Sequence, residues 1–184
     1  MENLTKATND SNSYNQKSLP EGDGFRVGLN ITHSPINIIS LISASHHPEA
    51  GAMVLFSGEV RNHNMGKEVE YLEYEAFVPM AAQMIDAIVK EATARWNLNY
   101  AVCQHRIGKV GICESAVCTI TASAHRKEAY EANQYIIHRV KHEVPIWKKE
   151  YFKDGSVSWG NNCNCPDVNN HIEFDAKEIL TNKS

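Results

Sequence analysis

The chain has 184 residues, of which 42% are hydrophobic and 22% are charged, a composition typical of a globular protein with a sizeable core. Its formal net charge of -4 argues against a general nucleic-acid binder, because such proteins carry a basic surplus. No stretch approaches the roughly 20 consecutive apolar residues that span a bilayer, so we expect no membrane association.

The amino-terminal segment predicts neither secretion nor import into mitochondria. Residues 1–24 lack an apolar signal segment, and they contain acidic residues but no arginine. Because Asn and Ser dominate, we expect a disordered N-terminal tail over residues 1–24. A single α+β domain is expected over residues 25–160, followed by a flexible C-terminal tail over residues 161–184. The expected location is the cytosol.

Five cysteines form no regular framework, and their odd number in a reducing compartment disfavours structural disulfides. Cys103 and Cys118 lie in apolar runs, which predicts buried thiols. Cys163, Cys165 and His171 suggest a zinc site, but the spacing fits no common motif and a fourth ligand is missing. We therefore predict no metal site, and the sequence implies no organic cofactor for this chain.

The first half of the domain predicts strands around one polar turn. Residues 25–31 alternate weakly, as in a strand, and residues 37–44 form a short apolar helix. Residues 51–60 read as a buried strand, and residues 68–77 as an alternating one. Between them, residues 61–66 are polar and end in glycine, as a turn does. Arg61 then lies at the mouth of this turn, where it either reaches an anion or forms a surface salt bridge.

The second half contains two helices and three strands. Pro79 suits the first turn of a helix whose apolar positions continue to Ala92. Residues 100–107 and 113–122 read as strands joined across residues 108–111. A second helix follows Ser123, and its apolar residues recur at helical spacing, which predicts one buried face: Ala129, Ala132, Ile136, Val140 and Val144. This helix ends at Val144, because Pro145 disfavours helical geometry in the residue before it. Residues 146–150 leave this helix in extended form. The order predicts an α+β fold of antiparallel sheets with packed helices.

The second helix places cations near both of its ends. Lys141 lies in the last turn and Lys148 lies just beyond the proline break. His125 and Arg126 lie at the start, where free backbone N–H groups and the helix dipole favour an anion. A helix–proline–strand corner fixes side chains firmly, as a preorganised site requires. The ordinary alternative is that Lys141 is a solvated lysine that complements the helix dipole.

Several motifs occur in one order over about residues 51–159, and together they resemble the large, catalytic subunit of molybdopterin synthase. The motifs are GAMVLFSGEVRNHNMG, LEYEAFVPMA, HRIGKV, SAHR and VKHEVPIWKKE. The resemblance implies the α/β hammerhead fold of that subunit and an enzyme, a sulfurtransferase of molybdenum cofactor biosynthesis. Sulfur would pass from the C-terminal Gly-Gly thiocarboxylate of a small ubiquitin-like partner to cyclic pyranopterin monophosphate. The large subunit would form a homodimer at the centre of a heterotetramer.

The resemblance also implies roles for individual residues. Lys141 and Lys148 correspond to the catalytic lysines of the family. The predicted substrate-binding residues are Arg61, His125, Arg126, Lys149 and Glu150. Two departures stand out: no arginine follows Trp159 closely, and Cys113 stands where a small residue is usual.

Two other interpretations remain open from the sequence. One is a non-catalytic adaptor that binds a ubiquitin-like partner, and the other is a phosphate-binding enzyme of different chemistry. Retention of the lysines, His125 and the arginines argues against an adaptor.

Overall fold

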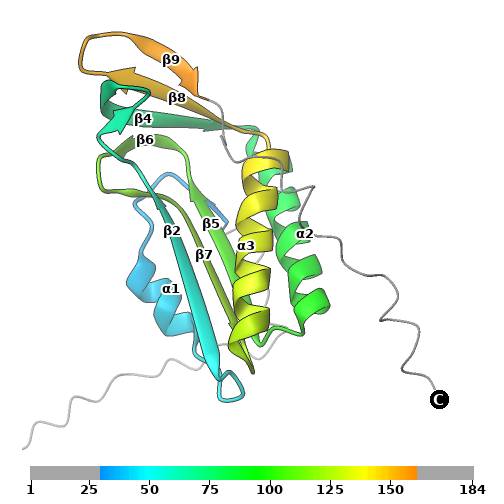
Figure 1. Cartoon of the computed structure of the whole chain (residues 1–184). Coiled ribbons are helices and arrows are strands. Elements are labelled where there is room, and N and C mark those ends of the chain that lie inside the picture. Colours follow the sequence, from blue (N-terminus) through cyan, green and yellow to red (C-terminus); the bar gives the residue numbers. More distant parts are fainter. Residues whose placement is uncertain (1–29, 161–184) are drawn as a thin grey trace, which may run out of the picture.

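The computed structural model describes residues 30–160, which form two sheets joined at an angle, with helices against the lower one (Figure 1). The predicted α+β class with antiparallel sheets is confirmed. The predicted tails, residues 1–24 and 161–184, lie outside the described residues, as do Cys163, Cys165 and His171.

The lower sheet has the strand order β1-β5-β7-β2, and only the β1–β5 pair is parallel. Its strands are β1 (Ile31–Thr32), β2 (Ala52–Glu59), β5 (Tyr100–Arg106) and β7 (Ser115–Ser123). Helices α2 (Val78–Trp96) and α3 (Arg126–Glu143) pack together on one side of this sheet, and α1 (Ile38–Ser45) lies on the other (Figure 1). The predicted helices at 37–44 and after Pro79 are confirmed, as is the helix that follows Ser123.

The upper sheet is antiparallel, with the order β3-β4-β8-β9 and β6 added to β4. Its strands are β3 (His63–Asn64), β4 (Lys67–Ala76), β6 (Gly108–Gly111), β8 (Ile146–Phe152) and β9 (Val157–Gly160). Three of them, β3, β6 and β9, were not predicted, and β3 lies within the turn expected at residues 61–66. Residues 108–111 were expected to be a plain connection, but Gly108 adopts a φ of 81°, and the chain leaves β5 there to pair with β4. Strand β9 was missed because it is short and half polar.

The two strands on either side of Arg61 do not pair with each other, contrary to the predicted strand–turn–strand unit. Strand β2 pairs with β7 in the lower sheet, whereas β4 pairs with β8 in the upper sheet. The segment between β2 and β3 therefore crosses from one sheet to the other. Arg61 lies in this crossing, at the junction of the two sheets.

The end of α3 follows from its sequence. Its apolar positions Ala129, Ala132, Ile136 and Val140 are buried, as their spacing predicted. Val144 is extended, with a ψ of 133°, because Pro145 follows it. The chain enters β8 at Ile146, so the last turn of α3 and the first residues of β8 meet at one corner.

Apolar side chains fill the space between the two long helices and the lower sheet. The buried members of this core include Ile85, Ile88, Ile136 and Val140, and Cys103 also belongs to it. Cys118 is buried too, so both predicted core thiols are confirmed. A smaller cluster around Val69, Val110 and Phe152 holds the upper sheet together. The corner where α3 meets β8 is thus supported from both sides.

Candidate active site

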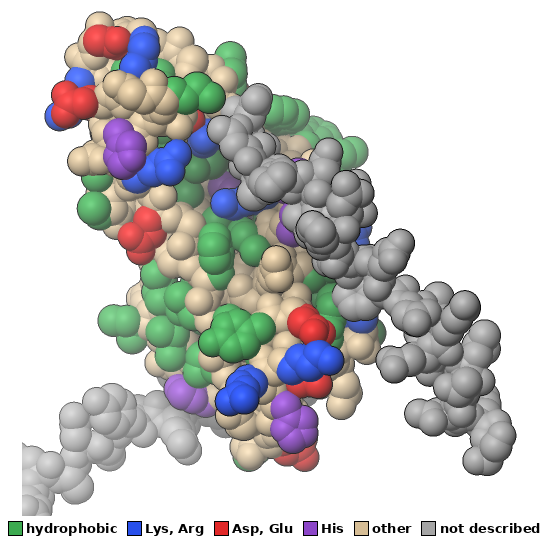
Figure 2. Space-filling view, viewed as in Figure 1, with side chains coloured by type: hydrophobic (Ala, Val, Ile, Leu, Met, Phe, Trp, Pro, Cys, Tyr) green, Lys and Arg blue, Asp and Glu red, His purple; other side chains and the backbone are tan. Residues whose placement is uncertain are grey.

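A cavity of about 870 Å³ opens at the junction of the two sheets. Its walls come from the end of β2, the β3–β4 hairpin, the last turn of α3, and strands β8 and β9. Its polar and charged lining includes Arg61, His63, Asn64, Lys67, Tyr74, His105, Lys141, Lys148 and Glu150. Figure 2 shows Lys, Arg and His side chains gathered where the upper sheet meets the body of the molecule.

Lys141 is the half-buried cation of this cavity. Its Nζ lies 5.5 Å from the centroid of the Phe56 ring, and no carboxylate within residues 30–160 pairs with it. Burial lowers the pKa of Lys141, and the neighbouring charge of Lys148 lowers it further. A lysine with a lowered pKa exchanges a proton more readily near neutral pH than a solvated one. Lys141 is therefore not the fully solvated lysine of the ordinary alternative.

Lys148 is held in place by a buried carboxylate. The Nζ atom of Lys148 lies 2.8 Å from Oε1 of Glu150, whose side chain is only 3% exposed. The amide of Asn64 donates a hydrogen bond of 2.6 Å to the other oxygen, Oε2. Burial alone would raise the pKa of Glu150, but the hydrogen bonds from Lys148 and Asn64 outweigh burial, and the pKa is lowered. Glu150 is therefore ionised and orients Lys148 rather than binding an anion itself.

Arg61 reaches the same network through a neutral side chain. Its Nη2 donates a hydrogen bond of 3.2 Å to Oδ1 of Asn64. No Asp or Glu among residues 30–160 forms a salt bridge with Arg61, so the alternative of a surface salt bridge does not describe it. Its guanidinium thus lines the cavity without direct neutralisation.

Two residues at the bottom of the cavity, His105 and Tyr74, were not predicted from the sequence to belong to the site. His105 at the end of β5 is 6% exposed, and its Nδ1 lies 2.8 Å from the carbonyl oxygen of Arg106. Its ring packs edge-on against Tyr74, with centroids 5.1 Å apart. Burial lowers the pKa of His105 to about 4, and Lys141 contributes to the shift. Burial raises the pKa of Tyr74 to about 12. The HRIGKV motif contains His105, but its chemistry could not be read without the fold.

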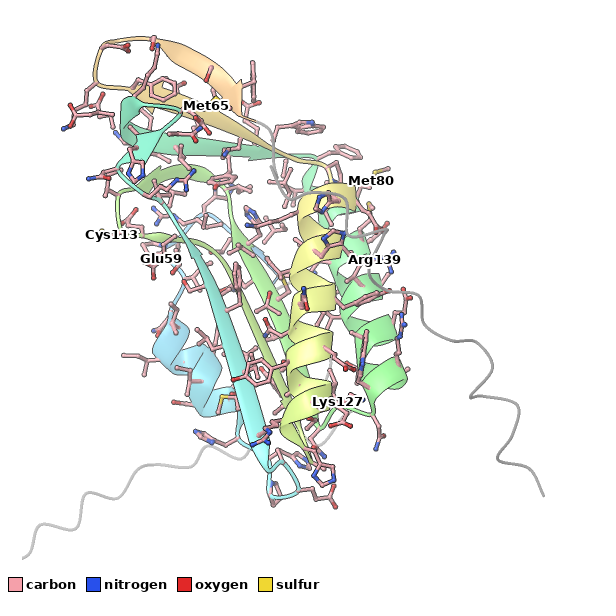
Figure 3. The ribbon with its side chains drawn as sticks, in the orientation of Figure 1. Glu59, Met65, Met80, Cys113, Lys127 and Arg139 are labelled. Atoms are coloured by element: carbon pink, nitrogen blue, oxygen red, sulfur yellow. The ribbon has the colours of Figure 1, made fainter. Side chains whose placement is uncertain are left out.

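The remaining predicted residues lie elsewhere in the single chain. His125 and Arg126 are exposed at the other end of α3, where Figure 3 labels the neighbouring Lys127. Arg126 precedes Lys141 by 15 positions in the helix, or about 22 Å at the ordinary helical rise. One chain therefore does not bring this pair to the lysines.

Lys149 also lies outside the cavity lining. Side chains alternate along β8, so Lys149 faces away from Lys148 and Glu150. Its Nζ lies 5.4 Å from the Tyr151 ring and 5.5 Å from the Trp159 ring. A role for Lys149 in substrate binding remains a prediction that this arrangement does not support within one copy.

Within residues 30–160 no three His, Cys, Asp or Glu side chains gather as they would around a metal ion. No helix in this range is long and apolar enough to cross a membrane. What the cavity offers instead is an excess of positive charge. Four Lys or Arg side chains line it (Arg61, Lys67, Lys141 and Lys148), against the two carboxylates of Glu59 and Glu150. Such a site stabilises anionic ligands and charge that develops during a reaction.

Sequence comparison identifies relatives of this chain among known proteins. Residues 31–143 match the family model described as MoaE protein. A relative from Bacillus subtilis (strain 168), named molybdopterin synthase catalytic subunit, is 48% identical over 125 residues, which cover 68% of this chain and 80% of the relative. A relative of the same name from Thermoplasma volcanium is 45% identical over 132 residues, which cover 71% of this chain and 96% of the relative.

The fold agrees as well. The crystal structure of molybdopterin synthase from Staphylococcus aureus superposes with a TM-score of 0.68 at 39% identity, covering 72% of this chain and 96% of that one. The family match spans more than half of the chain, and the relatives are covered over most of their length. The chain therefore belongs to the MoaE family of molybdopterin synthase catalytic subunits.

Proposed function

We propose that this chain is the catalytic subunit of a molybdopterin synthase and transfers sulfur to cyclic pyranopterin monophosphate in the cavity between its two sheets. The sulfur comes from the C-terminal thiocarboxylate of a small ubiquitin-like partner in the cytosol. The observation that carries this proposal is the convergence of Arg61, Lys141 and Lys148 on one cavity. Both reactants are anions, so their approach requires fixed cations.

The roles of the two lysines follow from their surroundings. Lys148 is tied to Glu150, so it supplies a fixed positive charge that holds an anionic group. Lys141 has no carboxylate partner among the described residues and has a lowered pKa. Lys141 therefore assists proton transfer while the sulfur attacks and an oxygen leaves.

Arg61 extends the positive lining toward the cavity mouth. In this proposal its guanidinium binds the cyclic phosphate, for which a planar fork of N–H donors is well suited. His125 and Arg126 bind the phosphate region only if a second copy brings the start of its α3 to this cavity. The proposal therefore includes a homodimer, with one small subunit on each copy in a heterotetramer.

Shared sites can be tested by complementation. Homodimers of Arg126→Ala and of Lys141→Ala are expected to be almost inactive. Subunit exchange between them creates mixed dimers with one site that carries both changes and one that carries neither. Activity should then return to roughly a quarter of the wild-type level, because random exchange makes about half of the dimers mixed. If activity does not return after verified exchange, His125 and Arg126 do not complete the partner's cavity.

The function itself is tested by mixing the purified chain with thiocarboxylated small subunit and cyclic pyranopterin monophosphate. Formation of the dithiolene product is the expected result. Binding of the small subunit without product would identify the non-catalytic adaptor. Turnover of a phosphate compound without any effect of the small subunit would identify a phosphate-binding enzyme of different chemistry.

A further inference from the structure

Asn64 occupies an unusual position between the charges of the cavity. It lies at the end of β3, beside a two-residue turn of Met65 and Gly66, whose φ values are 47° and 77°. Positive φ at both turn residues is the geometry that matches the twist of a hairpin and fixes its register. Asn64 pairs with Lys67 across this turn. The backbone therefore holds the Asn64 side chain in one place.

Both polar atoms of the Asn64 side chain are used. Its Oδ1 accepts the hydrogen bond from Arg61 at 3.2 Å, and its Nδ2 donates to Glu150 at 2.6 Å. Glu150 in turn binds Lys148 at 2.8 Å. One neutral amide thus stands between a cation and the buried carboxylate, and it contacts both.

We propose that Asn64 is a positioning residue that holds the Arg61 guanidinium in place while keeping it apart from the Glu150 carboxylate. The inference deepens the proposed function and relies on it for the identity of the anionic substrate.

The chemical reason is that an amide orients a cation without cancelling its charge. A carboxylate at position 64 would form an ion pair with Arg61 and would repel Glu150. An apolar residue there would release Arg61 and leave Oε2 of the buried Glu150 without its donor. Only a neutral side chain with both a donor and an acceptor meets both requirements, and asparagine has this pair in a short side chain.

The test compares Asn64→Ala and Asn64→Asp with the wild-type complex in the sulfur-transfer assay. For Asn64→Ala we expect KM for the pterin substrate to rise roughly tenfold with a smaller change in kcat, because substrate binding loses an oriented cation. For Asn64→Asp we expect a larger rise, and partial recovery as the pH is lowered. Protonation of the introduced carboxyl group is favoured by Glu150 and opposed by Arg61, and where it occurs it restores a neutral donor between the same two groups.

The matched controls are Asn62→Ala and Asn62→Asp. Asn62 belongs to the same crossing segment, but its side chain contacts His63 rather than Arg61 or Glu150. These variants should keep the wild-type KM and pH profile. If the Asn64 variants only lower Tm, with KM and pH profile unchanged in the folded enzyme, Asn64 has a structural role and the proposal is overturned.

A second readout does not depend on sulfur transfer. Carboxyl NMR of the full chain should show a higher pKa for Glu150 in Asn64→Ala than in wild type, because a donor to the charged form is lost. Inorganic phosphate should bind Asn64→Asp more weakly than Asn62→Asp, although both carry the same net charge. Equal phosphate affinity and an unchanged Glu150 pKa would refute the positioning role even if the enzyme proved to catalyse another reaction.

Discussion

Replacing His105 with glutamine removes the titratable ring from the floor of the cavity and leaves a polar side chain of similar reach. In the folded protein the pKa of His105 is lowered to about 4, chiefly by burial. In the unfolded chain the same group titrates near its ordinary value of about 6.5. Between these values the unfolded chain binds a proton that the folded chain does not. Stability is therefore lost as the pH falls through this range.

The size of the effect follows from the two pKa values. Each unit of difference corresponds to about 1.4 kcal/mol when the pH lies below both values. At pH 4.5 most of the difference is expressed, so His105 should lower the free energy of unfolding by about 2 kcal/mol relative to pH 7. Other groups titrate in the same range, so only the difference between wild type and His105→Gln isolates this contribution.

Urea unfolding of wild type and His105→Gln at pH 7 and pH 4.5 measures this contribution of His105 to the free energy of unfolding. His105→Gln should be less stable at pH 7, because the hydrogen bond to the Arg106 carbonyl is disturbed. From pH 7 to pH 4.5, however, it should lose about 2 kcal/mol less than wild type. Parallel losses in the two proteins would show that His105 is not held neutral by burial, and the description of the cavity floor would be wrong.

Two further substitutions test the strand ends around the cavity. Gly160→Ala would place a Cβ 2.5 Å from both Glu150 Oε1 and Lys148 Cε. The ion pair must then move, and the sulfur-transfer rate should fall roughly tenfold to a hundredfold. Lys153→Ala, in the turn after β8 and outside the cavity lining, should keep the wild-type rate. Cys113 is exposed with a φ of 64°, so Cys113→Gly should raise the free energy of unfolding by up to about 1 kcal/mol in urea titrations. A loss of stability would show that Cys113 is not strained.

The left-handed backbone at Cys113 also bears on the cysteine at this position, which departs from the family that the sequence resembles. The tight turn after β6 places this position at positive φ, which glycine adopts without steric cost, so the small residue that the resemblance implied would fit here better than cysteine. Sequence reasoning identified the departure, whereas the φ angle appears only in the fold.

Local patterns predicted most elements because each carried its own signal. The end of α3 was predictable from Pro145, and the buried face of the helix from the spacing of Ala129, Ile136 and Val140. Strands β6 and β9 were not predictable in this way, since they are short and exist through pairing with β4 and β8. Their formation depends on contacts between distant segments.

The same distinction holds for the site. Lys141 and Lys148 were expected to converge because one proline corner connects them in sequence. Asn64 and His105 joined them only through sheet pairing, so no local pattern indicated their roles. His125 and Arg126 carry a strong local signal as well, yet the length of α3 keeps them about 22 Å from Lys141 within one copy.

The most direct test of the proposed sulfur-transfer site compares two lysine substitutions in a single-turnover assay with thiocarboxylated small subunit. Lys141 lines the cavity, whereas Lys153 is exposed and pairs with Glu68 outside it. Lys141→Ala should lose at least roughly a hundredfold in rate while still binding the small subunit, because proton transfer is lost. Lys153→Ala should react at the wild-type rate. Sulfur transfer by Lys141→Ala at a rate equal to that of Lys153→Ala would contradict the assignment of the cavity as the catalytic centre.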